Sequence, residues 1–592
     1  MECERHLLIM YYNSYDLTYK NPFGAVKTNT EVYFFVEVTD ATEVYLVIKS
    51  DDGDYKYIWM NRIQKNDKIG YEITFIPDRA ILYFYHFQIN IKSKHNLLKN
   101  SHEQDFQLTV YDDYKVPDWY KNGIVYQIFP DRFYNPYKHP IDYKPNSFIY
   151  ATWDDIPMNI INEERELVRH DFYGGNLQGV IEKLDYLELL GVNIIYFNPI
   201  FQSTSNHKYN TQDYNKIDTM LGDEPTFKRL LDECKKRNMH VILDGVFNHT
   251  GDDSEYFKIA QNDKNSMYYS WYYFKDYPKT YESWWGFTTL PKVNSMNPTF
   301  RDFVMGKENS ILSHWMKLGV DGWRLDVVDE LDGEFVEEFK SSMKYFNKNS
   351  VLIGEVWEDA SNKIAYSQRK KYFMGKQLDS VMGYPFRTNV IDFLNCSISG
   401  KQITDNFKLL KENYPREAFY ANMNLLSTHD VPRLINMLNF DMDNFKSALA
   451  LQMTFAGVPH IYYADEVGQQ GAMTPDSRRA FPWNNINQDI LKLYKKLISL
   501  RKNNRIFVDG EIKFKYLNDD VFFFTRYFDD ENNIDKKVSV LIVRKTTILT
   551  IDLKYGTIFD VMNDCQLKVG EGTINHTFKK GFYIFSNYDL NK

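Results

Sequence analysis

The stretch GWRLDVVD, residues 322–329, has the pattern of a buried strand that carries charge near its carboxyl end. Its apolar residues are β-branched or bulky, whereas Arg324 and Asp326, two positions apart, point to the same face. Such a pair is either a structural ion pair or part of a catalytic site. In the catalytic interpretation, Arg324 keeps Asp326 ionised and oriented, as a nucleophile must be.

The region around this stretch alternates strand-like runs with runs of helical periodicity. The predicted strands are 123–129, 193–200, 240–247, 322–328, 351–357, 378–384, 419–426 and 460–464. The helices expected between and after them include 176–190, 224–237, 300–317, 334–346, 364–374, 444–455 and 490–501. Eight such units predict a (β/α)₈ barrel. A doubly wound open sheet is the alternative, but no glycine-rich phosphate loop follows the first strand.

The pattern divides the chain into three domains. Residues 1–118 have the period of two that is typical of strands and predict a β-sandwich resembling a carbohydrate-binding module. The barrel is expected over 119–506, with an inserted domain at about 250–296 that is too long for a simple loop. Because the insertion follows the third strand, we expect it to form a wall of the active-site cleft. Residues 507–592 predict a C-terminal antiparallel sandwich.

Composition excludes several classes of function. The net charge is −9 and no long basic run is present, which argues against nucleic acid or an anionic membrane as partner. The apolar run Leu7–Met10 is too short for a signal peptide, and no apolar stretch approaches the about 20 residues of a membrane span. The cysteines are far apart and form neither a zinc motif nor a disulfide framework: Cys3, Cys234, Cys396 and Cys565. We therefore expect a cytoplasmic protein.

Acidic side chains stand at the predicted carboxyl ends of three strands: Asp326, Glu355 and Asp430. These strand ends meet at one rim of a barrel, which is where catalytic residues are found. Like charges so close raise one another's pKa, so one carboxyl is expected to hold a proton while the one beside Arg324 stays ionised. This predicts glycoside hydrolysis with Asp326 as nucleophile and Glu355 as general acid/base.

Other polar residues at the same rim are predicted to bind substrate. Asp430, His249 and His429 are expected to hold the hydroxyls of the reacting sugar. Each histidine alone would be interpreted as a satisfied core residue, and their position beside the carboxylates favours the functional interpretation. Asp244 is expected to orient Arg324, Tyr209 to stack on the sugar and His207 to bond its primary hydroxyl. The predicted substrate-binding set is Arg324, His249, His429, Tyr209, His207, Asp244 and Trp357.

Several motifs resemble those of the α-amylase family of glycoside hydrolases, especially its cyclomaltodextrinase, neopullulanase and maltogenic amylase group. The matching stretches are DGVFNH (244–249), GWRLDVV (322–328), GEVW (354–357), LLSTHD (425–430), SNHKYNTQDY (205–214), LPKVN (290–294), YQIFPDRF (126–133) and DEVGQQGAMTPDSRR (465–479). The resemblance implies retaining cleavage of α-1,4-glucosidic bonds in cyclodextrins, pullulan or short maltooligosaccharides. It implies that Asp326 is the nucleophile, Glu355 the acid/base and Asp430 the transition-state stabiliser.

The resemblance also implies a homodimer in which the N-terminal module of one subunit reaches the site of the other. The group often has a calcium loop, but here the corresponding stretches are 135–137 and 174–176 and lack its carboxylates, so no cofactor and no tightly held calcium are expected. The residues after the nucleophile, 327–330, and Asn210 also depart from the usual pattern. An exo-acting α-glucosidase or a 4-α-glucanotransferase remains an alternative, and a non-catalytic sugar-binding protein a more remote one.

Overall fold

A computed structural model describes residues 9–65, 67–91, 94–137, 144, 146–163, 167–528, 536–553, 557–562, 565–568 and 573–590. Contacts between residues divide the chain into two compact units. The first comprises Met1–Lys115 with Asp359–Gln377 and Asn406–Phe419, and the second comprises Val116–Glu358, Leu378–Asp405 and Tyr420–Lys592. The first unit thus holds most of the predicted N-terminal module.

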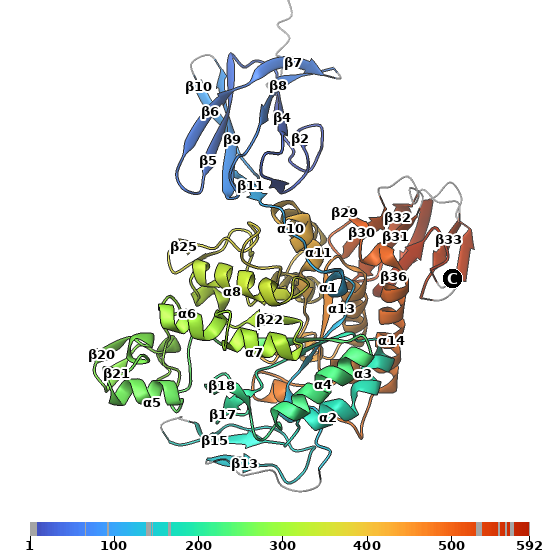
Figure 1. Ribbon diagram of the computed structural model, residues 1–592. Helices are drawn as coiled ribbons and strands as arrows, with labels where there is room; N and C mark the ends of the chain where they lie inside the picture. The colour runs from blue at the N-terminus through green and yellow to red at the C-terminus, as the bar shows by residue number, and fades with distance from the viewer. Residues whose placement is uncertain are drawn as a thin grey trace, which may run out of the picture. The chain divides into compact units, whose positions relative to one another are not determined.

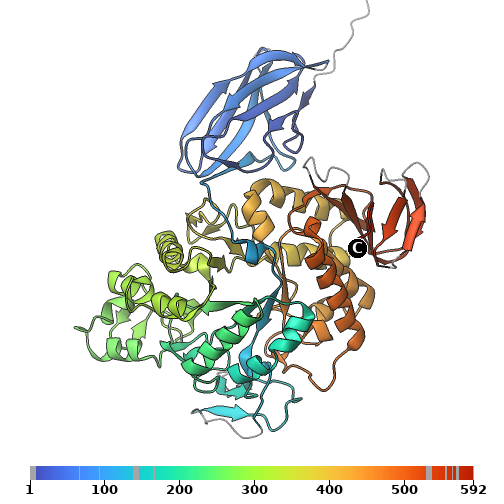
Figure 2. The ribbon, with the colours of Figure 1, turned by 45° about the vertical axis from the view of Figure 1, so that its right-hand side comes forward.

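The first unit is built on two sheets, drawn in blue in Figures 1 and 2. One sheet has the order β1 (Met10–Tyr11), β4 (Val32–Val38), β8 (Lys68–Phe75), β7 (Asn61–Lys65). The other has the order β3 (Val26–Lys27), β11 (Phe106–Tyr111), β9 (Leu82–Ile91), β5 (Glu43–Ser50), β6 (Tyr55–Trp59). Alternate residues of β4 and β5, such as Phe34 and Leu46, are fully buried in one shared core. The predicted sandwich is confirmed. The period of two places the apolar side chains of each strand on one face, and the two apolar faces pack together.

The expected helix at 364–374 is wrong. Those residues form a short hairpin of β24 (Ile364–Ala365) and β25 (Gln368–Arg369) and pack into the first unit. There Arg369 forms an ion pair with Asp51. The apolar spacing of these residues indicates only a weak helical preference. Packing within the first unit overrides that preference.

Eight parallel strands form the centre of the second unit, in the order β26-β23-β22-β19-β16-β12-β28-β27. Their bounds are β12 (Val125–Ile128), β16 (Ile194–Phe197), β19 (His240–Gly245), β22 (Gly322–Leu325), β23 (Val351–Gly354), β26 (Ser380–Val381), β27 (Met423–Asn424) and β28 (Val458–Tyr462). A parallel bridge between Met382 and Met423 joins the two edges of this sheet. All eight predicted strands are present in this order, and the (β/α)₈ barrel is confirmed.

Helices lie outside these strands, as Figures 1 and 2 show. They include α2 (Leu177–Glu182), α3 (Leu184–Leu190), α4 (Glu224–Lys236), α6 (Pro298–Met305), α7 (Ile311–Leu318), α8 (Gly333–Phe346), α9 (Tyr384–Leu394), α13 (Met442–Thr454) and α14 (Gln488–Asn503). Side-chain caps set the starts of α4, α8 and α14, since Asp223, Asp332 and Asn487 each accept a hydrogen bond from a backbone N–H of the first turn. The predicted single helix at 300–317 is two helices, divided at Gly306.

The seventh predicted strand is too long. Residues Arg416–Ala421 form a helix, α11, and only Met423–Asn424 pair in the sheet as β27. Pro415 precedes the helix, and its carbonyl accepts a hydrogen bond from Phe419 N at 2.9 Å. A proline is favourable at a helix start because its fixed φ suits the first turn.

Two long connections enlarge the rim of the barrel. The connection after β12 contains a three-stranded sheet that was not predicted: β13 (Ser147–Ile149), β15 (Leu167–Phe172) and β14 (Ile160–Ile161). The predicted insertion at 250–296 contains α5 (Glu255–Asn262) and the hairpin β20 (Phe274–Asp276) and β21 (Thr280–Tyr281). Val293 N donates to Asn248 O at 2.9 Å, which fastens the insertion to the end of the third strand.

The C-terminal strands, drawn in orange and red, form a six-stranded sheet and a separate hairpin (Figure 1). The sheet has the order β29 (Glu511–Phe514), β30 (Val521–Tyr527), β31 (Lys537–Val543), β36 (Gly581–Ser586), β33 (Thr557–Asp560), β34 (Cys565–Lys568). The hairpin consists of β32 (Thr547–Asp552) and β35 (Thr573–Phe578). Their buried apolar side chains share one core, as the predicted sandwich requires.

A buried carboxyl, that of Glu466, stands shortly after the last barrel strand in the chain and makes stability depend on pH. Glu466 Oε1 accepts hydrogen bonds from Tyr126 and Tyr186, each at 2.8 Å, and burial raises the pKa of Glu466 to about 7. A carboxyl with a raised pKa contributes stability below its unfolded-state pKa, and that stability is lost as the pH rises through the folded-state value.

We therefore expect Glu466→Gln to stabilise the protein at pH 8 by up to about 3 kcal/mol, because the amide carries no charge to bury. At pH 4.5 the two proteins should be equally stable. Urea denaturation across this pH range measures the difference. An equal effect at both pH values would mean that ionisation of Glu466 is not its cause.

Candidate active site

One buried guanidinium joins three of the strand-end carboxylates. Arg324 stands in β22 between β19, which contains Asp244, and β23, which Glu355 directly follows. Arg324 Nη1 lies 2.8 Å from Asp244 Oδ1 and 2.9 Å from Asp326 Oδ1, and Nη2 lies 2.9 Å from Glu355 Oε2. The structure thus brings together the predicted nucleophile, the predicted acid/base and the residue expected to orient Arg324.

These contacts change one part of the electrostatic prediction. The sequence predicts that Arg324 singles out Asp326 as the ionised carboxylate, but the guanidinium contacts Glu355 at the same distance. Burial raises the pKa of Asp326 well above its ordinary value, and Arg324 opposes this shift. Proximity to Arg324 alone therefore does not separate the two roles. They differ in their other partners, since Glu355 Oε1 also accepts from Trp357 Nε1 at 3.0 Å.

The backbone directly after Asp326 is strained. Val327 has φ 39° and ψ 47°, in the left-handed region that a β-branched residue rarely adopts. This conformation costs about 1–3 kcal/mol and persists only where the surroundings enforce it. Here Val327 N donates to Glu355 Oε2 at 2.8 Å. The turn thus links the segment that follows the predicted nucleophile to the predicted acid/base.

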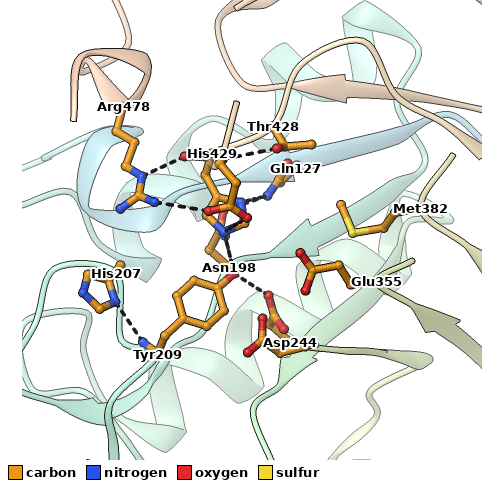
Figure 3. A network of polar contacts seen from close by, with 12 residues as sticks. Gln127, Asn198, His207, Tyr209, Asp244, Glu355, Met382, Thr428, His429 and Arg478 are labelled. Carbon is orange, nitrogen blue, oxygen red and sulfur yellow. Dashed lines mark hydrogen bonds and ion pairs between the residues drawn. The ribbon is translucent and has the colours of Figure 1, made fainter. Parts of the chain in front are cut away.

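A second group of polar residues surrounds His429 (Figure 3). Tyr209 OH donates to Asp244 Oδ2 at 2.9 Å and lies 2.7 Å from His429 Nε2, with the two rings nearly parallel. Gln127 Nε2 lies 3.0 Å from His429 Nδ1, so Nδ1 is the acceptor and Nε2 carries the hydrogen. Burial and the nearby Arg478 lower the pKa of His429 well below its ordinary value. His429 is therefore a neutral hydrogen-bond donor.

Asp430 belongs to the same group. Its Oδ2 lies 3.1 Å from His429 Nε2, and its Oδ1 lies 3.3 Å from Arg478 Nη2. Burial raises the pKa of Asp430, and Arg478 and Arg324 oppose the shift. Arg478 also donates to the carbonyl of His429 at 2.9 Å, as Figure 3 shows.

The remaining predicted ligands lie around this group. His207 Nδ1 accepts from Tyr209 N at 3.2 Å (Figure 3), and burial lowers the pKa of His207 well below its usual value. His249 Nε2 donates to Tyr209 O at 3.1 Å, and burial lowers the pKa of His249 to about 4. Trp357 is half-exposed and stacks on Tyr384 with ring centroids 4.0 Å apart. All ten predicted site residues thus belong to the second unit.

Several polar residues of the site are absent from the sequence-based prediction. They are Tyr196, which donates to Asp244 Oδ2 at 2.7 Å, and Gln127, Asn198 and Arg478. Three of them lie in or directly after strands whose sequence pattern predicts only a buried core: Tyr196, Gln127 and Asn198. Arg478 falls within the motif 465–479, whose order along the chain gives no sign that it returns to Asp430.

A family model described as the alpha amylase catalytic domain matches residues 127–489. The chain belongs to the alpha-amylase family. An amylopullulanase of Thermoanaerobacter thermohydrosulfuricus is 32% identical over 87% of this chain and 40% of its own length. A cyclomaltodextrinase of Thermoanaerobacter pseudethanolicus is 32% identical over 88% of this chain and 90% of its own length. The chain thus spans less than half the length of the amylopullulanases it matches.

Solved structures agree with this membership. A structure named cyclomaltodextrinase, 27% identical, superimposes with a TM-score of 0.72 and covers 98% of this chain and 99% of that one. The type III pullulan hydrolase from Thermococcus kodakarensis, 26% identical, gives a TM-score of 0.71 and covers 98% of this chain. None of the helices among the described residues has both the length and the apolar composition of a membrane span.

The stretches that correspond to the calcium loop of the alpha-amylase group, 135–137 and 174–176, offer amide oxygens in place of carboxylates. Asn135 Oδ1 accepts from Tyr137 N at 2.9 Å, and Asn176 Oδ1 accepts from Gly179 N at 2.9 Å to cap α2. Both amide oxygens therefore already have backbone partners, and neither stretch contains a carboxylate. Among the residues that the structure describes, no cluster of three or more His, Cys, Asp and Glu could hold a metal ion.

Proposed function

We propose that this chain is a retaining α-glucan hydrolase that cleaves α-1,4-glucosidic bonds. The observation that carries the proposal is the contact of one buried guanidinium, that of Arg324, with Asp244, Asp326 and Glu355 at the barrel rim. Retaining glycosidases need two carboxyl groups about 5 Å apart, on either side of the bond they cleave. The contacts of Asp326 and Glu355 with the two terminal nitrogens of one guanidinium support such a pair.

In the proposed reaction, Asp326 attacks the anomeric carbon while Glu355 protonates the leaving oxygen. The covalent glycosyl-enzyme is then hydrolysed by water that Glu355 deprotonates, so the anomeric configuration is retained. Asp430 and the neutral imidazole of His429 would bind hydroxyls of the reacting ring, and Tyr209 would support them. Membership in the alpha-amylase family supports this assignment of the two carboxylates.

We propose cyclodextrins, pullulan or short maltooligosaccharides as substrates. The support is the similarity to proteins named cyclomaltodextrinase, neopullulanase and maltogenic alpha-amylase, which are 32–36% identical to this chain. Incubation with β-cyclodextrin, maltotriose, pullulan and soluble starch, followed by chromatography, tests this choice. We expect β-cyclodextrin and maltotriose to be cleaved faster than starch, with α-anomers as the first products by NMR. Faster starch breakdown would contradict the substrate class, and β-anomers would contradict the mechanism.

We propose that the reaction needs no calcium ion. The lack of carboxylates in the two loop stretches supports this, because hard cations prefer charged oxygen ligands. Dialysis against EDTA is therefore expected to leave both kcat and the melting temperature unchanged, within about 1 °C. A drop in melting temperature that added calcium reverses would show that a site exists.

We propose a cytoplasmic homodimer formed through the N-terminal module. Three aromatic side chains of the edge strand β6 are at least half exposed and lie on one face: Tyr55, Tyr57 and Trp59. Such a face suits a second copy as partner. Among the described residues, Cys234 and Cys396 form no disulfide bond. Free thiols are typical of a reducing compartment and support the cytoplasmic location. Light scattering of wild type and Tyr57→Glu tests the dimer, and cell fractionation tests the location.

A further inference from the structure

Trp285, in η3 (Trp284–Gly286) of the insertion, is exposed and yet held in place. The exposed fraction of its side chain is 77%. Its Nε1 donates to Glu330 Oε1 at 3.0 Å, and its ring lies 5.6 Å from that of Trp284 at an angle of 29°. Its φ of 50° is in the left-handed region, which costs a non-glycine residue free energy. Core packing does not explain an indole that is exposed to this extent and is held in a costly backbone conformation.

Glu330 is the anchor that fixes this tryptophan. Its Oε1 also accepts from Trp284 Nε1 at 3.0 Å, and its Oε2 accepts from Asn248 Nδ2 at 3.2 Å. The Glu330 side chain is 7% exposed. It stands four positions after Asp326 in the sequence, in η4 (Val328–Glu330). One carboxylate therefore couples the insertion to the end of the third strand and to the turn that follows the proposed nucleophile.

The rings of Trp284 and Trp285 continue a row that starts at the site. Trp284 stacks on His249 with centroids 5.4 Å apart at 30°. His249 in turn bonds the backbone of Tyr209, whose hydroxyl contacts Asp244 and His429. Three successively stacked rings, those of His249, Trp284 and Trp285, thus lead from the site to an exposed indole.

We propose that Trp285, positioned by Glu330, stacks on a glucose unit of the substrate outside the ring that is cleaved. This rests on the proposed function. A pyranose has an apolar C–H face on which an indole can stack. Recognition of an uncharged sugar in this way requires no charged side chain. A pre-oriented side chain loses little conformational entropy on binding, which is the benefit of the hydrogen bond to Glu330. The residue thereby favours glucans long enough to reach it over shorter ones.

The test compares a long and a short substrate in Trp285→Ala. We expect KM for maltohexaose to rise about tenfold, whereas kcat/KM for 4-nitrophenyl α-maltoside should stay within about twofold of wild type. Tyr345→Ala, which removes a 66% exposed aromatic ring from α8, is the matched control and should change neither. Circular dichroism confirms that each variant is folded.

Glu330 is tested as a positioning residue through the same comparison. Glu330→Ala should raise KM for maltohexaose nearly as much as Trp285→Ala, and the double variant should add little, because both changes remove one interaction. Glu330→Gln keeps an oxygen that can accept from the indoles, so it should recover most of the lost affinity.

The outcomes separate this inference from the proposed function. If the wild type cleaves none of the α-glucans, the proposed function is wrong. If the wild type is active but Trp285→Ala has unchanged KM for maltohexaose, only the role of Trp285 is wrong. Equal losses on both substrates would mean that Trp285 merely supports the fold of the site, and this would also overturn the inference.

Discussion

Asp326→Asn is expected to lower kcat by several orders of magnitude while the protein remains folded. The amide cannot form the glycosyl ester, so covalent catalysis is lost, whereas Arg324, His429 and the other ligands remain. Affinity for β-cyclodextrin should therefore be retained. Single-turnover kinetics and calorimetric titration measure the two quantities. A variant with near-normal kcat would contradict the role of Asp326.

Glu355→Gln is the partner experiment, because proximity to Arg324 does not distinguish the two carboxylates. A substrate with fluoride as leaving group needs no acid in the first step, but the second step still needs a base. We therefore expect Glu355→Gln to accumulate a glycosyl-enzyme from α-maltosyl fluoride. Peptide mass spectrometry should find the sugar on Asp326. A label on any other carboxylate would reverse the assignment.

Arg324→Gln is expected to reduce both activity and stability. The change removes the positive charge that contacts three buried carboxylates. Deletion of one partner of a buried ion pair costs about 3–5 kcal/mol of stability. We expect kcat to fall at least about a hundredfold, since the carboxylates lose both orientation and charge compensation. Urea denaturation and steady-state kinetics measure the two effects.

The loss of stability should depend on pH. Burial raises the pKa of Asp244 and Asp326, and Arg324 lowers it, so removal of Arg324 raises the folded-state pKa of both further. Groups with a raised folded-state pKa lose their contribution to stability as the pH rises, and the difference from wild type should therefore shrink at acid pH. The matched control is Arg501→Lys, which alters another buried guanidinium. Arg501 donates hydrogen bonds to the carbonyls of Met453, Phe455 and Gly457. This variant should cost stability without affecting kcat.

The sequence by itself determined the order of the domains and the eight barrel strands. Apolar and β-branched residues favour strands, as at Gly322–Leu325, and polar residues that follow parallel barrel strands meet at one rim. For this reason Asp244, Asp326, Glu355 and Asp430 could be grouped in advance. The N-terminal sandwich followed from the same local rule, because a period of two exposes one face and buries the other.

Only the tertiary structure decided which partner each of these side chains takes. Arg324 contacts Glu355 as well as Asp326, and Arg478 returns to Asp430 from 48 positions further along the chain. Glu330 likewise binds two indoles of the insertion. Periodicity fixes the face of a strand on which a residue lies, but hydrogen bonds depend on distances between segments that the sequence separates. The helix expected at 364–374 fails for the same reason, since its residues pack with Asp51 and its neighbours.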